Sequence, residues 1–409
     1  MFLKTFLIVA AGNSLSHVGK ALSLRSVLIR KNHTAIVAAG QNFSGIFSWL
    51  KIPFAVISDI QERDHSSFPT ITWFSDTAIV RNCVLEEIAL IERIQPDAVI
   101  GIFRFTLKAA AHMVGIPYYS LSCGCLLPDT NEPLGLFSDE AGNKKQQVNI
   151  DYFFRYAGSR IGRALNDSGL TKKITDAREM LLGDKTFLWD FPEFMPAREK
   201  AGRIHCGPLE WSDWPYDKID YSSILPATKP LAIISFGTCN FSDYVLNRLS
   251  KNLLALGYSV IVSTGGQGES SKQINDHPDL RVLNMLPLKK LLPHASLLIS
   301  HGGQLTIFAA LQAKIPTLVM PFHPEQAHNA SCLERIGCGR QLIDATFFYG
   351  KSEVYLAALE KMPDTQIRKR IRSLTEQTEL SRNLSIYSNI LNGYTGAETV
   401  ADILVNEMK

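Results

Sequence analysis

Short apolar runs alternate with longer amphipathic stretches along the chain. In the first half, the apolar runs cover residues 5–11, 34–39, 98–102 and 118–121, and stretches of helical periodicity cover 17–30 and 79–94. Runs of this length with few charges are typical of strands buried on both faces, as in parallel sheets. The repeated order of strand, loop and helix predicts an α/β fold with a doubly wound parallel sheet.

The second half repeats this order. Its apolar runs cover residues 231–236, 259–263, 280–284, 295–300 and 317–320, and its helical stretches cover 241–255 and 304–313. At 216–229, proline, serine, aspartate and lysine interrupt the periodicity, which predicts a linker. We therefore expect two Rossmann-like domains, at residues 1–216 and 230–375, joined by a linker at 217–229.

The composition of the chain indicates its domain size, the kind of partner its charge favours and its redox compartment. The 409 residues are enough for two domains that each bury a core, and 46% hydrophobic with 20% charged residues is ordinary for a soluble α/β protein. A net charge of +3, from 42 basic and 39 acidic residues, does not by itself indicate a nucleic-acid-binding protein. The 7 cysteines show no regular pairing, which indicates a reducing compartment, so we expect a cytoplasmic protein.

The apolar start of the chain is interpreted as a core strand. It contains a lysine and no cleavage pattern, and a loop-forming Gly12 follows it. No apolar run in the sequence reaches the length of a transmembrane helix, so we expect no stable membrane insertion.

The segment at 300–330 carries the strongest indication of a binding site. The apolar run at 295–300 is followed by His301, Gly302 and Gly303, and a helical stretch begins at Gln304. Glycines let the backbone approach a ligand closely, and the start of a helix favours an anion because its N–H groups are unpaired. His301 can add a hydrogen bond to a phosphate oxygen. The pattern therefore predicts a phosphate-binding turn.

A second polar group follows the next predicted strand. That strand, at 317–320, ends at Pro321, and Glu325 and Gln326 come after it. A carboxylate and an amide together can hold adjacent sugar hydroxyls. Because open parallel sheets bind ligands beyond the carboxyl ends of their strands, we expect the phosphate and sugar contacts to be neighbours.

This segment resembles the donor-binding signature of the inverting UDP-glycosyltransferases of the macrolide glycosyltransferase and UDP-glucuronosyltransferase family, which have the GT-B fold. The matching residues are His301, Gly302, Gly303, Thr306, Ala310, Pro316, Pro321, Gln326, Asn329, Ala330, Gly337, Cys338 and Gly339. Leu305 and Lys314 depart from the pattern without removing a proposed ligand contact. The resemblance implies two domains facing across a cleft, an acceptor-binding first domain, a donor-binding second domain, and a helical segment at 376–409 that crosses back to the first.

The resemblance also implies further donor contacts. Gly237 and Thr238 match the family's loop beside the diphosphate, and Gly265 ends the next strand, where an ordinary glycine turn is an equally good interpretation. The segment of Met285 and Leu286 matches the one whose backbone groups contact the base, which implies a UDP- or dTDP-sugar. The predicted donor-binding residues are Gly237, Thr238, Gly265, Met285, Leu286, His301, Gly302, Gly303, Gln304, Thr306, Glu325 and Gln326.

His17 is the predicted catalytic residue. It lies between the first apolar run and the first helical stretch, at a corner that resembles the family's Gly-His-Val/Pro loop. The family's histidine there is the base toward the acceptor hydroxyl, and imidazole suits this role because its ordinary pKa is near neutral. The alternative is a histidine that only caps or packs at a helix start. The resemblance implies an inverting hexosyltransferase.

One departure concerns the acid that orients such a histidine. The segment at 94–107 resembles the family's strand ending in Asp-Phe-Arg, but Ile102 occupies the position of the aspartate. Asp97 is no substitute, since it precedes the strand and should lie at the opposite end of the sheet. Three interpretations remain open: His17 works alone; another group reshapes the site, such as Asp59, Asp64 or Arg104; or the chain is a non-catalytic nucleotide-sugar-binding or partner subunit.

The remaining expectations concern metal, reaction and acceptor. The sequence contains no Asp-X-Asp tripeptide, which disfavours a divalent ion on the diphosphate, so we expect no metal and no cofactor besides the nucleotide-sugar co-substrate. A nucleotide-sugar 2-epimerase would need several acids around the sugar that we do not find. A small-molecule or lipid-like acceptor is expected, while a nucleic-acid acceptor and the oligomeric state are left open.

Overall fold

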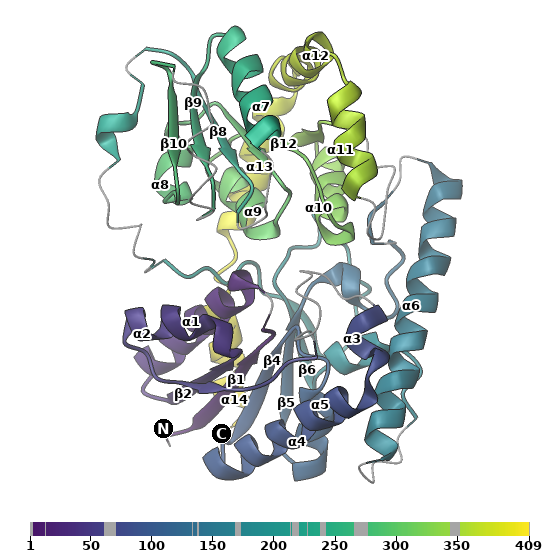
Figure 1. Cartoon of the computed structure of the whole chain (residues 1–409). Coiled ribbons are helices and arrows are strands. Elements are labelled where there is room, and N and C mark those ends of the chain that lie inside the picture. The colour runs from purple at the N-terminus through teal and green to yellow at the C-terminus, as the bar shows by residue number, and fades with distance from the viewer. Residues whose placement is uncertain are drawn as a thin grey trace. The chain divides into compact units, whose positions relative to one another are not determined.

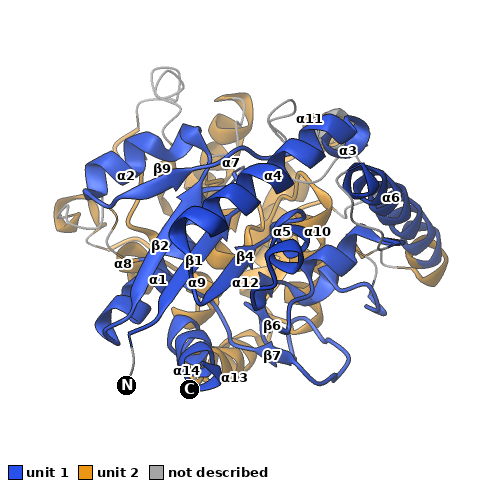
Figure 2. Ribbon diagram, turned by 90° about the horizontal axis from the view of Figure 1, so that it is seen from below, with its two compact units in different colours: residues 1–133, 144–211, 394–409 blue, residues 134–143, 212–393 orange. Residues whose placement is uncertain are grey.

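The computed structural model forms two compact units. Unit 1 comprises residues 1–133, 144–211 and 394–409, and unit 2 comprises 134–143 and 212–393 (Figure 2). The described residues are 3–12, 14–60, 71–132, 134–136, 139–167, 173–212, 214, 221–226, 228–237, 243–265, 277–343 and 352–408, without the side chains of 352–356. The expected linker at 217–229 falls within unit 2.

Unit 1 contains a parallel seven-stranded sheet in the order β3-β2-β1-β4-β5-β6-β7 (Figure 1). Its strands are β1 (Thr5–Ala10), β2 (Thr34–Ala39), β3 (Phe54–Val56), β4 (Ala98–Ile102), β5 (Tyr118–Ser122), β6 (Lys185–Leu188) and β7 (Arg203–His205). The helices between them are α1 (Leu15–Arg30), α2 (Ser44–Leu50), α3 (Ile71–Ser75), α4 (Thr77–Ile94), α5 (Leu107–Val114) and α6 (Glu140–Asn166), of which residues 140–143 are assigned to unit 2.

Unit 2 contains a parallel six-stranded sheet in the order β10-β9-β8-β11-β12-β13. Its strands are β8 (Leu231–Ser235), β9 (Ser259–Ser263), β10 (Leu280–Leu283), β11 (Leu297–Ser300), β12 (Thr317–Val319) and β13 (Gly339–Gln341). Its helices are α7 (Asp243–Ala255), α8 (Leu288–Leu291), α9 (Gln304–Gln312), α10 (Pro324–Arg335), α11 (Ser352–Lys361), α12 (Asp364–Thr375) and α13 (Leu380–Asn392).

The last helix returns to unit 1. This helix, α14 (Ala397–Glu407), belongs to unit 1, whereas α13 remains in unit 2. The segment expected to cross back as a whole, 376–409, is therefore divided between the units at Tyr394.

The prediction of two doubly wound α/β units is confirmed, and the reason is visible in the strands. Residues Phe6 to Ala10 of β1 are fully buried, as a continuous apolar run predicts for a strand covered on both faces. The strands expected at 34–39, 98–102 and 259–263 have the expected bounds. Helix starts are set by caps, such as Ser14, whose side chain accepts a hydrogen bond from the Ser16 N–H.

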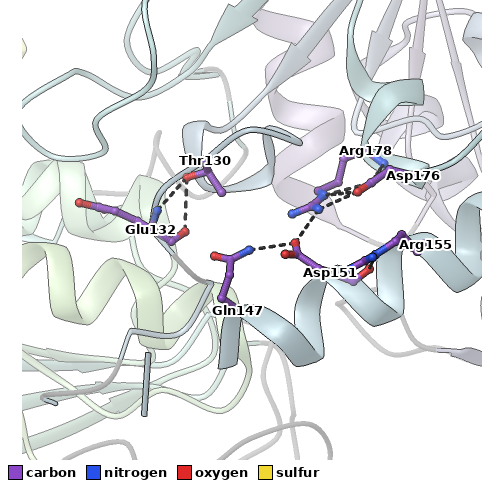
Figure 3. Close-up of polar contacts among 7 residues, drawn as sticks. All are labelled: Thr130, Glu132, Gln147, Asp151, Arg155, Asp176 and Arg178. Carbon is purple, nitrogen blue, oxygen red and sulfur yellow. Dashed lines mark hydrogen bonds and ion pairs between the residues drawn. The ribbon is translucent and has the colours of Figure 1, made fainter. Parts of the chain in front are cut away.

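The long helix α6 was not among the expected elements, and buried polar contacts hold it in unit 1. The Arg178 guanidinium contacts Asp151 of α6 at 2.8 Å and Asp176 at 2.6 Å (Figure 3). Gln147 donates to the same Asp151 at 2.8 Å, and Arg178 lies 4.9 Å from the centre of the Phe154 ring. The contact between Asp151 and Arg178 joins residues 27 positions apart in sequence, and local periodicity does not reveal a contact of this kind.

Two further findings concern membrane-spanning helices and cysteines among the described residues. Among the described residues, no helix combines the length and apolarity needed to cross a lipid bilayer. The six described cysteines are buried, and none of them forms a disulfide.

Candidate functional site

Both sheets have a point where the strand order reverses, and several of the predicted site residues lie there. In unit 1 the reversal falls between β1 and β4, where His17 lies in the first turn of α1 and Phe103 follows β4. In unit 2 it falls between β8 and β11, where Gly237 and His301 follow the two strands. Ligands of doubly wound sheets bind in the crevice outside such a point.

Aromatic rings and a lysine surround His17. Its ring centre lies 5.1 Å from that of Phe103 and 6.0 Å from that of Trp189, which follows β6. The Nζ atom of Lys20 lies 4.5 Å from the centre of the Trp189 ring and donates to the Ser16 hydroxyl at 2.7 Å. The His17 Nδ1 atom is buried and has no hydrogen-bond partner among the described residues. His17 is thus held by packing rather than by a polar partner.

These surroundings keep His17 neutral. Burial lowers its pKa well below 6.5, and the positive charge of Lys20 lowers it further. No described carboxylate raises it. The imidazole is therefore unprotonated at pH 7 and available as a base, although a weak one.

Phe103 has a strained backbone. Its φ is +52°, a value uncommon for a residue with a bulky side chain. The Phe103 N–H is held by the Leu121 carbonyl of β5 at 3.2 Å. Strain of this kind persists where the surrounding structure fixes it, often at functional sites. Here it places an aromatic ring against the predicted base.

Ile102, at the position of the expected acid, is an ordinary core residue. It is fully buried at the end of β4 and pairs with Ala10 of β1. Asp97 lies at the other end of this sheet, as expected, where it accepts a hydrogen bond from the Thr5 N–H at 2.8 Å. Neither residue can supply a carboxylate to His17.

Arg104 organises a buried charged cluster beside this site. Its guanidinium contacts Asp59 and Glu87, each at 2.6 Å, and donates to the Ser58 carbonyl at 2.5 Å. Asp59 also accepts a hydrogen bond at 2.7 Å from the Gly12 N–H, in the loop that leads to α1. The cluster therefore fixes the loop before His17 without contributing an acid to its ring. Asp64 lies outside the described residues.

Burial and pairing set the charges of this cluster. Burial lowers the pKa of Arg104, but the Asp59 and Glu87 carboxylates raise it more, so the guanidinium stays charged. Burial raises the pKa of Glu87 despite its bonds to Arg104 and Thr106. The cluster supports the fold, and removing any one of its three charged residues would leave a buried charge uncompensated.

In unit 2, the ring of His301 packs against two glycines. Gly237 has a φ of +59°, and a Cβ added to it would lie 3.1 Å from His301 Cε1. A Cβ on Gly303 would lie 2.5 Å from His301 Nε2. Gly302 has a φ of +91°, and its carbonyl accepts a hydrogen bond from Asn329 at 3.0 Å. The glycines are therefore needed to seat the imidazole at the start of α9.

His301 is also neutral at pH 7. Burial lowers its pKa to about 4, although a hydrogen bond to the Ser235 backbone opposes this shift. Its Nδ1 atom is buried and lacks a partner among the described residues. A polar group in this condition lacks a bond that a ligand can supply.

Gln304 shows the same feature at the first position of α9. The residue is 6% exposed, and neither its amide nitrogen nor its amide oxygen has a partner among the described residues. It follows Gly303, the N-cap residue of α9. A residue with an unpaired amide, a histidine with an unpaired ring nitrogen and the first N–H groups of α9 thus lie within a few residues of one another, and this combination suits a polar anion.

The other predicted donor residues are buried, partly exposed or outside the described residues. Gln326 is 3% exposed, and its side-chain oxygen accepts a hydrogen bond at 2.8 Å from the N–H of Phe322, which lies just before α10. Glu325 is partly exposed and accepts from Asn329 at 3.2 Å. Leu286 lies in the apolar core, where only its backbone is available to a base. Gly265 follows β9 with a φ of +66°, Met285 and Thr306 are partly exposed, and Thr238 lies outside the described residues.

Sequence reasoning missed three residues beside His17: Lys20, Phe103 and Trp189. Lys20 follows one helical turn after His17, so the spacing alone could have indicated it. Phe103 lies next to Ile102 at a strand end, which is the usual place for a site residue in this fold. Trp189 had no such signal, since strand β6 before it was not expected.

The two units define an α/β protein with two doubly wound, Rossmann-like parallel sheets. Residues 248–363 match the family model described as "Erythromycin biosynthesis protein CIII-like, C-terminal domain". The chain is 24% identical over 356 residues to the PGL/p-HBAD biosynthesis rhamnosyltransferase of Mycobacterium bovis (strain BCG / Pasteur 1173P2), covering 82% of this chain and 76% of the relative.

Solved structures show the same fold. The glycotransferase of kitacinnamycin superposes with a TM-score of 0.76 at 16% identity, covering 100% of both chains. The glycosyltransferase VinC in complex with dTDP gives a TM-score of 0.69 at 14% identity, covering 99% of both chains. The chain thus has the GT-B fold of these glycosyltransferases, and residues 248–363 are similar to the C-terminal domain of the erythromycin CIII-like proteins.

Proposed function

We propose that the chain is an inverting, metal-independent hexosyltransferase that moves a sugar from a UDP- or dTDP-sugar to an acceptor hydroxyl. The observation that carries this proposal is the packing of the His301 ring against Gly237 and Gly303 at the start of α9. This arrangement supports binding of a diphosphate, because backbone N–H groups, an imidazole and the Gln304 amide meet there. Unit 2 is thus the donor-binding unit and unit 1 the acceptor-binding unit.

On the donor side, each group has a distinct part. The N-terminus of α9 and His301 stabilise the negative charge that grows on the diphosphate as it leaves. The side-chain amide of Gln304, which has no partner among the described residues, donates or accepts one hydrogen bond with the sugar nucleotide. The partly exposed carboxylate of Glu325 accepts from the sugar hydroxyls. No divalent ion is required for this set of contacts.

On the acceptor side, the reaction is a single displacement. His17 takes the proton of the acceptor hydroxyl while the hydroxyl oxygen attacks the anomeric carbon. The bond from that carbon to the diphosphate oxygen breaks, and the nucleotide leaves with the electron pair. One displacement inverts the configuration at the anomeric carbon.

The relatives inform the choice of donor and acceptor. The Mycobacterium relative is named a rhamnosyltransferase, and the VinC structure contains dTDP, so dTDP-sugars belong beside UDP-sugars in any screen. We expect a small-molecule or lipid-like acceptor. The non-catalytic alternative is supported by Ile102, which leaves His17 without an acid.

Nucleotide binding tests the proposal directly. Calorimetric titration of the folded protein with UDP, dTDP and GDP in EDTA should show binding of a pyrimidine nucleotide. His301→Ala should weaken it about 10- to 100-fold, as expected for a lost bond to a charged group. His294→Ala is the control, because that histidine is exposed before β11. Absence of binding to all three, or equal affinity in His301→Ala, would contradict the proposal. Binding without turnover over a broad acceptor panel would favour the non-catalytic alternative.

A further inference from the structure

We infer that the outer face of helix α6 is a docking surface for an anionic lipid bilayer, because exposed basic and apolar side chains form one row along it. This outer row consists of Lys145, Val148, Tyr152, Arg155, Ser159 and Arg163. It lies wholly within unit 1 and includes neither His17 nor any residue predicted to bind the nucleotide. The inference therefore goes beyond the proposed function and does not depend on it.

The helical repeat divides α6 into two faces. Positions three and four residues apart lie on the same side of a helix, so the six residues of the outer row follow one line along it. All six are exposed, whereas Ile150, Phe154 and Ile161 on the opposite face are buried in unit 1. Helix α6 lies at the edge of unit 1 in two views (Figures 1 and 2). At about 1.5 Å per residue, the row extends over roughly 27 Å.

The charge of the outer row is positive. Lys145 and Arg163 have no ion pair among the described residues, and Arg155 donates only to a backbone carbonyl, that of Asp151 at 3.2 Å. Between residues 144 and 166, Asp151 is the only acidic residue, and it lies beside the row rather than in it. Its carboxylate bonds to the Arg178 guanidinium at 2.8 Å (Figure 3). The three basic side chains of the row are therefore left to attract an anionic surface.

Two apolar side chains lie between these charges. Val148 is 65% exposed and Tyr152 is 70% exposed, and they are one helical turn apart. The boundary between headgroups and acyl chains accepts such groups, and tyrosine is enriched there because its ring is apolar and its hydroxyl is polar. Basic residues alone would also suit a nucleic acid. The position of Val148 and Tyr152 between Lys145 and Arg155 favours a lipid surface instead.

The expected binding is peripheral and reversible. Each basic residue near an anionic membrane strengthens binding about fivefold (about 1 kcal/mol), so the three of the outer row correspond to about 100-fold. This attraction falls off within a Debye length, roughly 10 Å at 0.1 M salt, so added salt weakens it. The apolar area of Val148 and Tyr152 adds a contribution that salt does not screen. Helix α6 would lie along the headgroups, with its buried face still packed in unit 1.

Flotation of the full-length protein with lipid vesicles tests the inference. Vesicles of phosphatidylglycerol and phosphatidylcholine should carry the protein at about 50 mM salt, and about 500 mM salt should release most of it. Vesicles of phosphatidylcholine alone should carry far less. Replacing all three basic residues of the outer row by glutamine should lower the partition into anionic vesicles about 100-fold. The positions are exposed, so a thermal melt like that of the unchanged protein should confirm that the variant folds.

The matched control removes the same charge from unit 2. It replaces three other exposed basic residues by glutamine: Lys361, Lys369 and Arg372. This control should float with anionic vesicles nearly as well as the unchanged protein. A second pair tests the apolar part: Tyr152→Ser should weaken binding several-fold, while Tyr244→Ser, at an exposed tyrosine of α7, should not.

The outcomes separate a lipid surface from other partners. No flotation with anionic vesicles, or an equal loss in the α6 variant and its control, would overturn the inference. So would unchanged flotation of Tyr152→Ser, which would mean a purely electrostatic contact. Binding of poly(U) that the α6 substitutions abolish, by protein that does not float with vesicles, would assign the face to nucleic acid and also overturn it. Failure to bind UDP and dTDP would instead contradict the proposed function and leave this inference standing.

Discussion

The ring of His17 lies 5.1 Å from the ring of Phe103, which reaches it from a backbone φ of +52° at the end of β4. Phe103 follows Ile102, the residue that replaces the acid of the family pattern. The strand therefore still directs a side chain at the histidine, but an aromatic one with no charge.

Replacing His17 by alanine should lower kcat by about 10²- to 10⁴-fold, the usual contribution of a positioned base. Nucleotide affinity should stay the same, because His17 and the donor residues belong to different units. Steady-state kinetics and calorimetry measure the two quantities. His112→Ala serves as the control, since that histidine is exposed at the end of α5. Full activity in His17→Ala would mean that another group is the base.

The pH dependence of kcat/KM should reflect the lowered pKa of His17. The base works in its neutral form, and burial and Lys20 lower its pKa below 6.5, so activity should persist as the pH falls past 6.5 and decline only near the lowered value. Ile102→Asp should raise the pKa of His17 and move this acid limb to higher pH. A wild-type limb centred above pH 6.5 would show that an unseen carboxylate acts on the ring.

Alanine at Gly237 should weaken nucleotide binding by displacing His301. Gly237 and Gly257 both have a positive φ, of +59° and +87°, so the backbone strain of an added Cβ is similar. Only at Gly237 does the added Cβ meet the His301 ring, at 3.1 Å, while nothing lies within 4 Å at Gly257. Calorimetry on both variants separates the two effects. Equal affinities in Gly237→Ala and Gly257→Ala would remove His301 from the diphosphate site.

Removing Arg104 should destabilise unit 1 strongly. Arg104→Met leaves Asp59 and Glu87 buried without their partner, which typically costs about 3–5 kcal/mol in the free energy of unfolding. Arg30→Met breaks an exposed pair with Glu398 and should cost about 1 kcal/mol or less. Urea unfolding of the two variants makes the comparison. A small effect of Arg104→Met would show that the cluster does not fix the loop before His17.

The sequence predicted the sheets well because buried parallel strands are continuous apolar runs, and β2, β4 and β9 appear at the expected residues. Helix α6 was not predicted because the contacts that hold it, such as that of Asp151 with Arg178, join residues far apart in the chain. Periodicity cannot register such a contact.

The residues of the candidate site likewise include some that the sequence predicts and others that it does not. His17, His301 and the glycines follow strands that the pattern identifies, so their positions could be expected. Trp189 could not, because it follows β6, a short strand without a strong apolar signature.

The most direct test of the account is the anomeric configuration of the product. The protein is incubated in EDTA with UDP-glucose or dTDP-rhamnose and an acceptor to which transfer has been detected, and the glycoside is analysed by proton NMR. A single displacement gives a glycoside whose anomeric configuration is opposite to that of the donor. A product with retained configuration, or transfer that requires an added divalent ion, would contradict the direct, metal-independent displacement.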